Sequence, residues 1–238
     1  MNVKLLFGTL ICSAAAVLSA ADVYLAGDST CATYPAKRAP LTGWGQQLAK
    51  RAKADCKVVN CAVSGRSTKS FREGGNWAKM MKQVKAGDFV LIQFAHNNRA
   101  KKDPKRYTTF EEFREQMTAF VKEVKAAKAN PVLVTPIEER KFKNGKFIAG
   151  RDLKKYSQII IEVAKAENVP VVDINAATWE WINKLGDEAS RKYYMAGSGL
   201  PGKERDNTHL SFDGANIVAD MFLTLSEKTE LPVRKCFK

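Results

Sequence analysis

The chain has 238 residues, of which 45% are hydrophobic and 27% are charged, a balance typical of a globular protein that excludes a disordered chain. Glycine and proline occur 15 and 8 times, which excludes collagen-like and low-complexity classes. Lysine and arginine outnumber aspartate and glutamate by 39 to 25, and the resulting net charge of +14 bears on binding partners rather than on fold.

The N-terminus is typical of a secretory signal peptide. Lys4 precedes an apolar stretch, and small residues follow it, so cleavage after Ala20 or Ala21 fits. The stretch is short for a membrane span, although a retained anchor is the alternative. We therefore expect a signal peptide over 1–21, one domain over 22–238, and a secreted or periplasmic mature protein with no membrane attachment.

After this segment, short β-rich runs alternate with helical patterns. The nearly continuous apolar run 89–95 indicates a strand buried on both faces, and Asn144-Gly145 is a strong hairpin signal. Apolar residues at helical spacing predict the helices. The expected strands cover 23–26, 58–62, 89–95, 131–135 and 169–174, a hairpin covers 142–147, and the expected helices cover 43–54, 109–130, 152–167 and 211–227.

Alternation of strands and helices implies an α/β fold, a parallel sheet with helices on both faces. Segment 189–205, rich in glycine and charge, is expected to be a surface loop. Ligands of such sheets bind outside the carboxyl ends of the strands. The residues that directly follow each strand are therefore the candidates for a site.

Polar groups that suit ester hydrolysis occupy these positions. Ser29 follows the first strand, Gly65 the second and Asn97 the third, while Asp206 and His209 precede the last helix. A serine hydroxyl needs a base to take its proton; an imidazole can do so when a carboxylate orients it. The backbone N–H groups of Ser29 and Gly65 and the Asn97 amide are candidate oxyanion donors.

Each of these residues alone has a structural explanation. Ser29 can cap a helix, Gly65 can be a turn glycine, and Asn97 can bond to loop backbone. His209 can be a structural histidine, and Asp206 can pair with Arg205 or a helix N-terminus. Their conjunction at one sheet edge favours a serine hydrolase. Neighbouring candidates for substrate contact are His96, Arg66 and Asn98. His96 is also the rival to His209 as the base, because the chain has only two histidines.

The ordered motifs GDST, NCAVSGRS, HNN and DNTH resemble the four blocks of the SGNH (GDSL-type) hydrolases. The longer strings GRSTKSF, IQFAHNN, NVPVVDIN and DNTHLSFDGA resemble rhamnogalacturonan acetylesterases over nearly the whole mature chain. The resemblance implies a three-layer α/β/α flavodoxin-like fold with a central parallel five-stranded sheet. It also implies Ser29 as nucleophile, Gly65 and Asn97 as oxyanion donors, Asp206 and His209 as the rest of a triad, and deacetylation of carbohydrate without a metal.

The chain departs from the family pattern in the third block, which usually reads Gly-x-Asn-Asp and here reads Ala95-His96-Asn97-Asn98. Ala95 replaces the glycine without strain only if its φ is negative. Asn98 removes a negative charge beside the donor asparagine. Neither change removes a catalytic group.

Four cysteines remain once Cys12 leaves with the signal, an even number that permits two disulfides in an oxidising compartment. We predict Cys31–Cys61, since both follow neighbouring strands at the active edge. We also predict Cys56–Cys236, since Cys56 precedes the second strand at the opposite edge, where the last helix ends. Free buried thiols are the alternative. The cysteine spacing does not resemble a zinc site.

The sequence thus predicts a secreted serine esterase that removes O-acetyl groups from an acidic plant cell-wall polysaccharide, as a monomer and without a cofactor. Alternatives are an SGNH esterase acting on xylan or peptidoglycan, or a non-catalytic polysaccharide-binding protein. Nucleic acid is not an expected partner, because no motif for it appears. Basic residues after the second and third strands are expected to rim the site: Arg66, Lys69, Arg72, Arg99, Lys101 and Lys102.

Overall fold

A computed structural model describes residues 21–148, 150 and 152–238. The expected signal peptide, apart from Ala21, lies outside the described residues, and it stays a prediction. Within the described ranges, no helix is both long enough and apolar enough to cross a membrane.

Five parallel strands form the central sheet in the order β2-β1-β3-β4-β7. They are β1 (Val23–Gly27), β2 (Val58–Asn60), β3 (Phe89–Gln93), β4 (Asn130–Val134) and β7 (Val171–Val172). The chain moves from β1 to β2 on one side and then crosses to β3 on the other. The carboxyl ends of β1 and β3 therefore form the switch point at which such sheets bind ligands.

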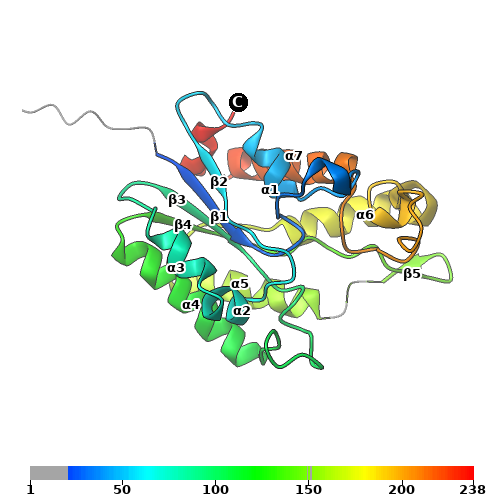
Figure 1. The fold of residues 1–238 in the computed structure, drawn as a ribbon, viewed down its shortest axis with the longest axis horizontal. Helices are drawn as coiled ribbons and strands as arrows, with labels where there is room; N and C mark the ends of the chain where they lie inside the picture. The colour runs from blue at the N-terminus through cyan, green and yellow to red at the C-terminus, as the bar shows by residue number, and fades with distance from the viewer. Residues whose placement is uncertain (1–20, 149, 151) are drawn as a thin grey trace, which may run out of the picture.

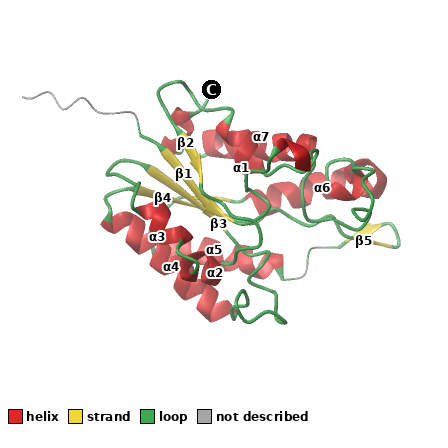
Figure 2. Cartoon of the chain, viewed as in Figure 1, coloured by secondary structure: helices red, strands yellow, loops and turns green. Residues whose placement is uncertain are grey.

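Helices cover both faces of the sheet and complete three layers (Figure 1). One layer holds α1 (Trp44–Ala49), α6 (Ile174–Arg191) and α7 (Phe212–Lys228). The other holds α2 (Thr68–Glu73), α3 (Asn76–Met81), α4 (Phe110–Ala126) and α5 (Leu153–Ala166). The hairpin of β5 (Phe142–Lys143) and β6 (Lys146–Phe147) projects beside α6 (Figure 2). The predicted α/β/α class and the five-stranded parallel sheet are confirmed.

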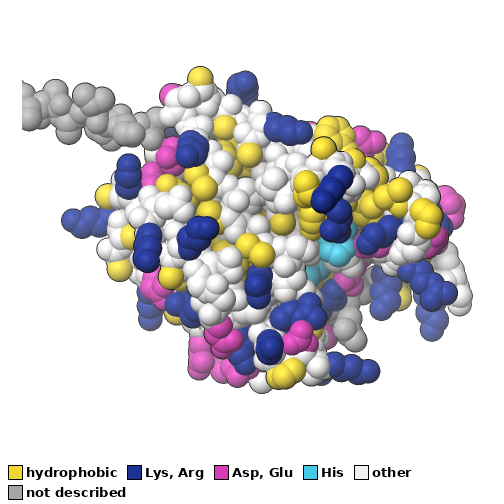
Figure 3. Space-filling view, in the orientation of Figure 1, with side chains coloured by type: hydrophobic (Ala, Val, Ile, Leu, Met, Phe, Trp, Pro, Cys, Tyr) yellow, Lys and Arg dark blue, Asp and Glu magenta, His cyan; other side chains and the backbone are white. Residues whose placement is uncertain are grey.

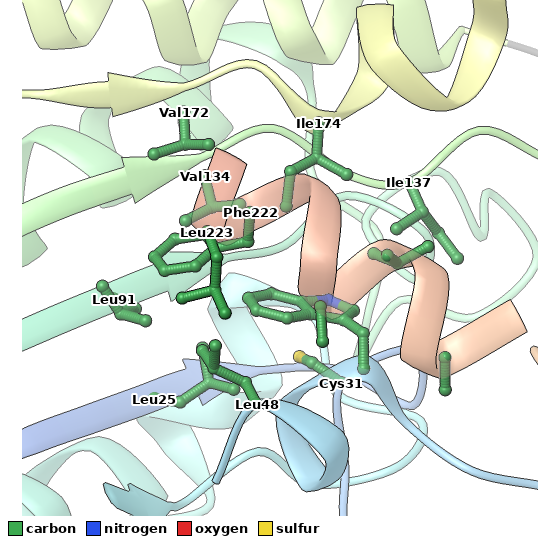
Figure 4. Close-up of a cluster of buried hydrophobic side chains, with 14 of the residues drawn as sticks. Leu25, Cys31, Leu48, Leu91, Val134, Ile137, Val172, Ile174, Phe222 and Leu223 are labelled. Atoms are coloured by element: carbon green, nitrogen blue, oxygen red, sulfur yellow. The ribbon is translucent and has the colours of Figure 1, made fainter. Parts of the chain in front are cut away.

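The sheet divides the core in two. Val23 and Leu25 of β1 belong to the cluster under α1 and α7, in which Figure 4 labels Leu25. Tyr24 and Ala26 belong to the cluster under α4 and α5. Successive side chains of a strand point to opposite faces, so a strand covered on both sides must be apolar throughout. All five residues of β1 are buried for this reason.

The predicted boundaries fail most clearly around β7. The strand expected over 169–174 ends at Val172, because the side chain of Asp173 accepts a hydrogen bond from the N–H of Ala176 and caps α6. Helix α6 was not predicted, and the expected loop 189–205 contains its end and a 3₁₀ helix, Met195–Gly197. The short helices α2 and α3 were also missed.

All four cysteines of the described residues carry free thiols. Cys31 belongs to the core cluster on one face of the sheet, and Cys61 packs against the cluster on the other face. The predicted Cys31–Cys61 bridge is therefore wrong. Neighbouring strand ends bring backbones together, but Cys31 lies in the turn after β1 and Cys61 directly follows β2, and these positions send the two side chains to opposite faces.

Cys56 and Cys236 lie near each other, but the predicted bridge between them is not formed in this structure. The two thiols donate to the carbonyl oxygen of Ala21 at 3.1 and 3.6 Å, and each is near enough to affect the pKa of the other. The N–H of Lys53 donates to the carbonyl of Cys236 at 2.9 Å, which holds the C-terminal segment against this edge. Burial raises the pKa of both thiols.

We expect oxidised glutathione to convert this thiol pair into a disulfide, with the two electrons and two protons passing to the glutathione. Non-reducing peptide mapping should find Cys56 linked to Cys236, with Cys31 and Cys61 reduced. The bridge closes a long loop, so the oxidised protein should have a Tm higher by roughly 5 °C or more than the reduced protein. A Cys56→Ser/Cys236→Ser variant should lose this response, and a Cys31–Cys61 link would contradict the expectation.

Candidate active site

Three predicted residues form one chain of hydrogen bonds at the carboxyl end of β1. The Oγ of Ser29 lies 3.0 Å from Nε2 of His209. The Nδ1 of His209 lies 2.9 and 3.1 Å from the two carboxylate oxygens of Asp206. In this geometry an imidazole can take the serine proton while the carboxylate holds its tautomer and orientation.

The loop before α7 fixes Asp206 and His209 relative to each other. The backbone N–H of His209 donates to Oδ1 of Asp206 at 3.1 Å, and Nζ of Lys203 lies 3.2 Å from Oδ2. Met195 and Ala196 of the 3₁₀ helix donate their N–H groups to the carbonyls of His209 and Asp206, at 2.8 and 2.9 Å. The segment expected to be a plain loop thus holds the site in place.

The carboxyl group of Asp206 is held in its charged form. Burial alone would raise its pKa, but the hydrogen bonds and charge of His209, together with Lys203, hold the pKa well below its ordinary value. A carboxylate that stays ionised can stabilise an imidazolium formed on His209 during the reaction.

Asp28 lies beside the serine but points away from it. Its Oδ1 accepts hydrogen bonds from the N–H and Oγ1 of Thr30, at 2.9 and 2.8 Å, and its Oδ2 lies 3.3 Å from Nδ1 of His96. Burial would raise the pKa of Asp28, but His96 and Thr30 lower it below its ordinary value. The hydroxyl of Tyr34 donates to the carbonyl of Ser29 at 2.7 Å and fixes the same turn.

The geometry favours His209 over His96 as the base. The side chain of His96 is only 4% exposed, and its Nδ1 is engaged with Asp28 rather than with Ser29. Its Nε2 has no hydrogen-bond partner within the described ranges. A substrate contact through Nε2 remains a prediction.

Asn97 and Gly65 stay predicted oxyanion donors, and the structure shows the local geometry of each. The Nδ2 of Asn97 donates to the carbonyl of Arg66 at 3.0 Å, which leaves its second hydrogen for another acceptor. Gly65 has a φ of 78°, in the left-handed region that favours glycine. A Cβ at Gly65 would meet no atom within 4 Å, so backbone conformation rather than crowding requires the glycine.

The two departures in the third block are absorbed by the fold. Ala95 does not have a positive φ, so it replaces the family glycine without backbone strain. Asn98 is fully buried, and its Nδ2 donates to the hydroxyls of Thr68 and Thr108 at 2.6 and 3.0 Å. The structure does not support the predicted substrate contact of Asn98, because its buried side chain joins the start of α2 to the loop before α4.

The guanidinium of Arg66 stays a candidate for substrate contact. Its Nε has no hydrogen-bond partner among the residues that the structure describes. Lys203, Tyr34 and Arg106 are site neighbours that sequence reasoning missed. Each of the three lies in a loop that carries no sequence motif. The sequence therefore carries no signal that its side chain contacts the site.

A hollow of about 630 Å³ is formed mainly by the loop that follows β3. Four cations and two carboxylates line it, with one alanine: Arg99, Lys101, Lys102 and Arg106; Asp103 and Asp152; and Ala100. We call it the basic hollow. Nη1 of Arg106 donates to Oδ1 of Asn97 at 3.3 Å, so the hollow adjoins the candidate oxyanion donor. Figure 3 shows histidine at the surface with lysine and arginine side chains around it.

A three-layer α/β/α fold with a serine, a histidine and an aspartate hydrogen-bonded at its switch point defines a class of serine-dependent hydrolases. Comparison with known families agrees. The model of the GDSL-like Lipase/Acylhydrolase family matches residues 25–217, and the chain belongs to this family.

Individual relatives within this family have more narrowly defined activities in their names. The chain is 34% identical over 219 residues to the rhamnogalacturonan acetylesterase RhgT of Bacillus subtilis, covering 90% of this chain and 92% of that protein. It is 29% identical to the probable rhamnogalacturonan acetylesterase YesY of the same organism, covering 89% of this chain and 94% of YesY.

Solved structures share the fold. The crystal structure of YxiM from Bacillus subtilis aligns with a TM-score of 0.75 and 25% identity over 89% of this chain, which spans 57% of that longer protein. Axe2, an acetylxylan esterase from Geobacillus stearothermophilus, aligns with a TM-score of 0.62 and 19% identity over 87% of this chain and 94% of Axe2.

Proposed function

We propose that this protein is a carbohydrate acetylesterase that removes O-acetyl groups from an acidic plant cell-wall polysaccharide such as rhamnogalacturonan. The observation that carries the proposal is the hydrogen-bonded chain of Ser29, His209 and Asp206 at the switch point. The similarity to RhgT over most of both chains supports the acetylated carbohydrate as substrate.

In the proposed reaction, Oγ of Ser29 attacks the acetyl carbonyl carbon while Nε2 of His209 takes its proton. The negative oxygen of the tetrahedral intermediate faces the N–H groups of Ser29 and Gly65 and the amide of Asn97. The sugar oxygen leaves with the proton from His209. Water, activated by His209, then hydrolyses the acetyl ester of Ser29 and releases acetate.

The basic hollow supports an acidic polymer as substrate. Lys101 and Lys102 are exposed side chains in its lining, and they can bind the carboxylates of uronate residues in the polymer. The signal-like N-terminus supports a secreted or periplasmic enzyme that meets this polymer outside the cytoplasm. We propose that it acts there as a monomer.

Acetate release from a panel of acetylated glycans tests the proposal. Acetylated rhamnogalacturonan should be deacetylated faster than acetylated xylan or O-acetylated peptidoglycan, and hydrolysis of p-nitrophenyl acetate should report the chemistry without polymer binding. An enzyme that prefers acetylated xylan would leave the esterase reaction in place and overturn the acidic substrate. Absence of turnover on every ester would favour a binding protein.

The charge of the substrate predicts a difference in response to salt. KM for acetylated pectin fragments should rise between about 50 and 300 mM salt, because the Debye length falls from roughly 14 to 6 Å, while KM for p-nitrophenyl acetate should stay nearly constant. Replacing Lys101 and Lys102 with glutamine should reduce the salt response. The matched control replaces Lys184 and Lys228, exposed lysines on α6 and α7, and should keep it. Equal salt responses for both substrates would remove the electrostatic argument.

A further inference from the structure

Arg106 extends from its own turn to the candidate oxyanion donor. Its Nη1 donates to Oδ1 of Asn97 at 3.3 Å, and its Nε donates to Oδ2 of Asp103 at 2.6 Å. The carbonyl of Asp103 accepts hydrogen bonds from the N–H groups of Arg106 and Tyr107, at 3.0 and 2.8 Å. Asp103 therefore organises the turn and holds the guanidinium beside the amide.

The Asn97 amide accepts a hydrogen bond in one contact and donates one in the other. A half-turn of the amide exchanges its oxygen and its nitrogen, and either arrangement fits the same space. A guanidinium can only donate, so Arg106 selects the amide oxygen. A carbonyl can only accept, so the carbonyl of Arg66, at 3.0 Å, selects the nitrogen. Together they fix one of the two orientations.

This orientation matters for the reaction. With the nitrogen held toward the carbonyl of Arg66, its second hydrogen is free to meet the negative oxygen of the intermediate. The reversed amide would present its oxygen there and repel the developing charge. A positive charge on the amide oxygen also draws electrons from the N–H bonds, which makes the amide a stronger donor.

We propose that Arg106 is a positioning residue for the esterase reaction, which fixes and polarises the amide of Asn97. The inference rests on the proposed function, and specifically on Asn97 as an oxyanion donor. Arg106 acts through Asn97 and needs no contact with the substrate. Its effect should therefore appear with a small neutral ester that leaves the basic hollow empty.

A double-mutant cycle on p-nitrophenyl acetate tests this. Asn97→Ala should lower kcat about 100-fold, the usual size of effect for a lost oxyanion donor, and Arg106→Ala should lower kcat about tenfold with KM unchanged. The double variant should be no slower than Asn97→Ala alone, because Arg106 has nothing left to orient. Arg106→Lys, which keeps a cationic donor, should recover part of the rate.

Arg114 on α4 is the matched control. Its side chain is 35% exposed against 37% for Arg106, and it also pairs with carboxylates, Glu111 three residues away and Glu162. Arg114→Ala should keep kcat within about twofold, as expected of an exposed ion pair. A tenfold loss in this variant would show that removal of any such arginine slows the enzyme, and it would overturn the inference.

The remaining outcomes separate the inference from the proposed function. Full additivity of Arg106→Ala and Asn97→Ala would overturn the positioning role while leaving the esterase intact. Wild-type kcat in Asn97→Ala would instead remove Asn97 from the oxyanion site. Should Arg106→Ala fail to fold, Asp103→Asn releases the guanidinium without deleting it. That variant should lower kcat in the wild-type background and leave it unchanged in Asn97→Ala, and equal losses in both backgrounds would overturn the inference.

Discussion

Replacing Ser29 with alanine should lower kcat on p-nitrophenyl acetate by on the order of 10⁴-fold or more, with KM little changed. The serine is the only group at the head of the hydrogen-bonded chain that can form an acetyl ester, and its Oγ lies 3.0 Å from Nε2 of His209. A residual rate above that in water should remain, because the oxyanion donors and the binding surface are untouched.

Two controls make the Ser29 result specific. The variant should unfold at nearly the wild-type temperature, because only one hydroxyl is removed. Covalent catalysis forms an acetyl ester on Ser29 before water releases acetate. Wild-type enzyme quenched in acid during turnover should therefore carry an acetyl group, about 42 Da of added mass, on the peptide that contains Ser29. A Ser29→Ala enzyme that retains a tenth of wild-type turnover would refute the assignment.

The position of the site could be predicted because its determinants are local. Strands buried on both faces appear in sequence as short continuous apolar runs, as in β1 and β3, and the residues directly after them must lie at one edge of a parallel sheet. Ser29 and Asn97 follow two such runs, and Gly65 follows β2, a partly buried strand at the edge of the sheet. All three therefore follow the carboxyl ends of strands of one parallel sheet.

The predictions that failed depend on how separate segments of the chain meet, which the pattern of one segment does not show. Ile174 continues the apolar run of β7, but the side chain of Asp173 starts a helix there, and Gly186, with a φ of 78°, interrupts the helical pattern of α6. The faces on which Cys31 and Cys61 lie depend on how the chain turns after β1 and β2, where neither residue belongs to a strand any longer. The contact of Arg106 with Asn97 depends on how a loop folds back, which no periodicity reports.

The fold also separates the two aspartates that flank the site. Asp28 and Asp206 each have a histidine as partner, and each has its pKa lowered below the ordinary value. Only Asp206 is linked through its histidine to Ser29. Since a lowered pKa in the folded protein makes the ionised form stabilising, both should contribute stability above the unfolded pKa, which is lost as the pH falls through their lowered values.

The two histidines should therefore respond differently to replacement. His209→Ala should lower kcat about as far as Ser29→Ala does, because it removes the group that accepts the serine proton. The side chain of His209 is 31% exposed, so added imidazole can reach the space and should restore part of the rate. The same imidazole should not accelerate Ser29→Ala, which has no hydroxyl to activate.

His96→Ala should act mainly on stability. It leaves the fully buried carboxylate of Asp28 without its His96 hydrogen-bond partner, a change that costs about 2 kcal/mol of unfolding free energy. Urea unfolding should show this loss at pH 7, while kcat of the folded fraction falls far less than in His209→Ala. Imidazole should give no recovery, because the side chain of His96 is only 4% exposed. A folded His96→Ala enzyme that is dead on p-nitrophenyl acetate, beside an active His209→Ala enzyme, would reverse the roles of the two histidines and make the Asp28–His96 pair the base.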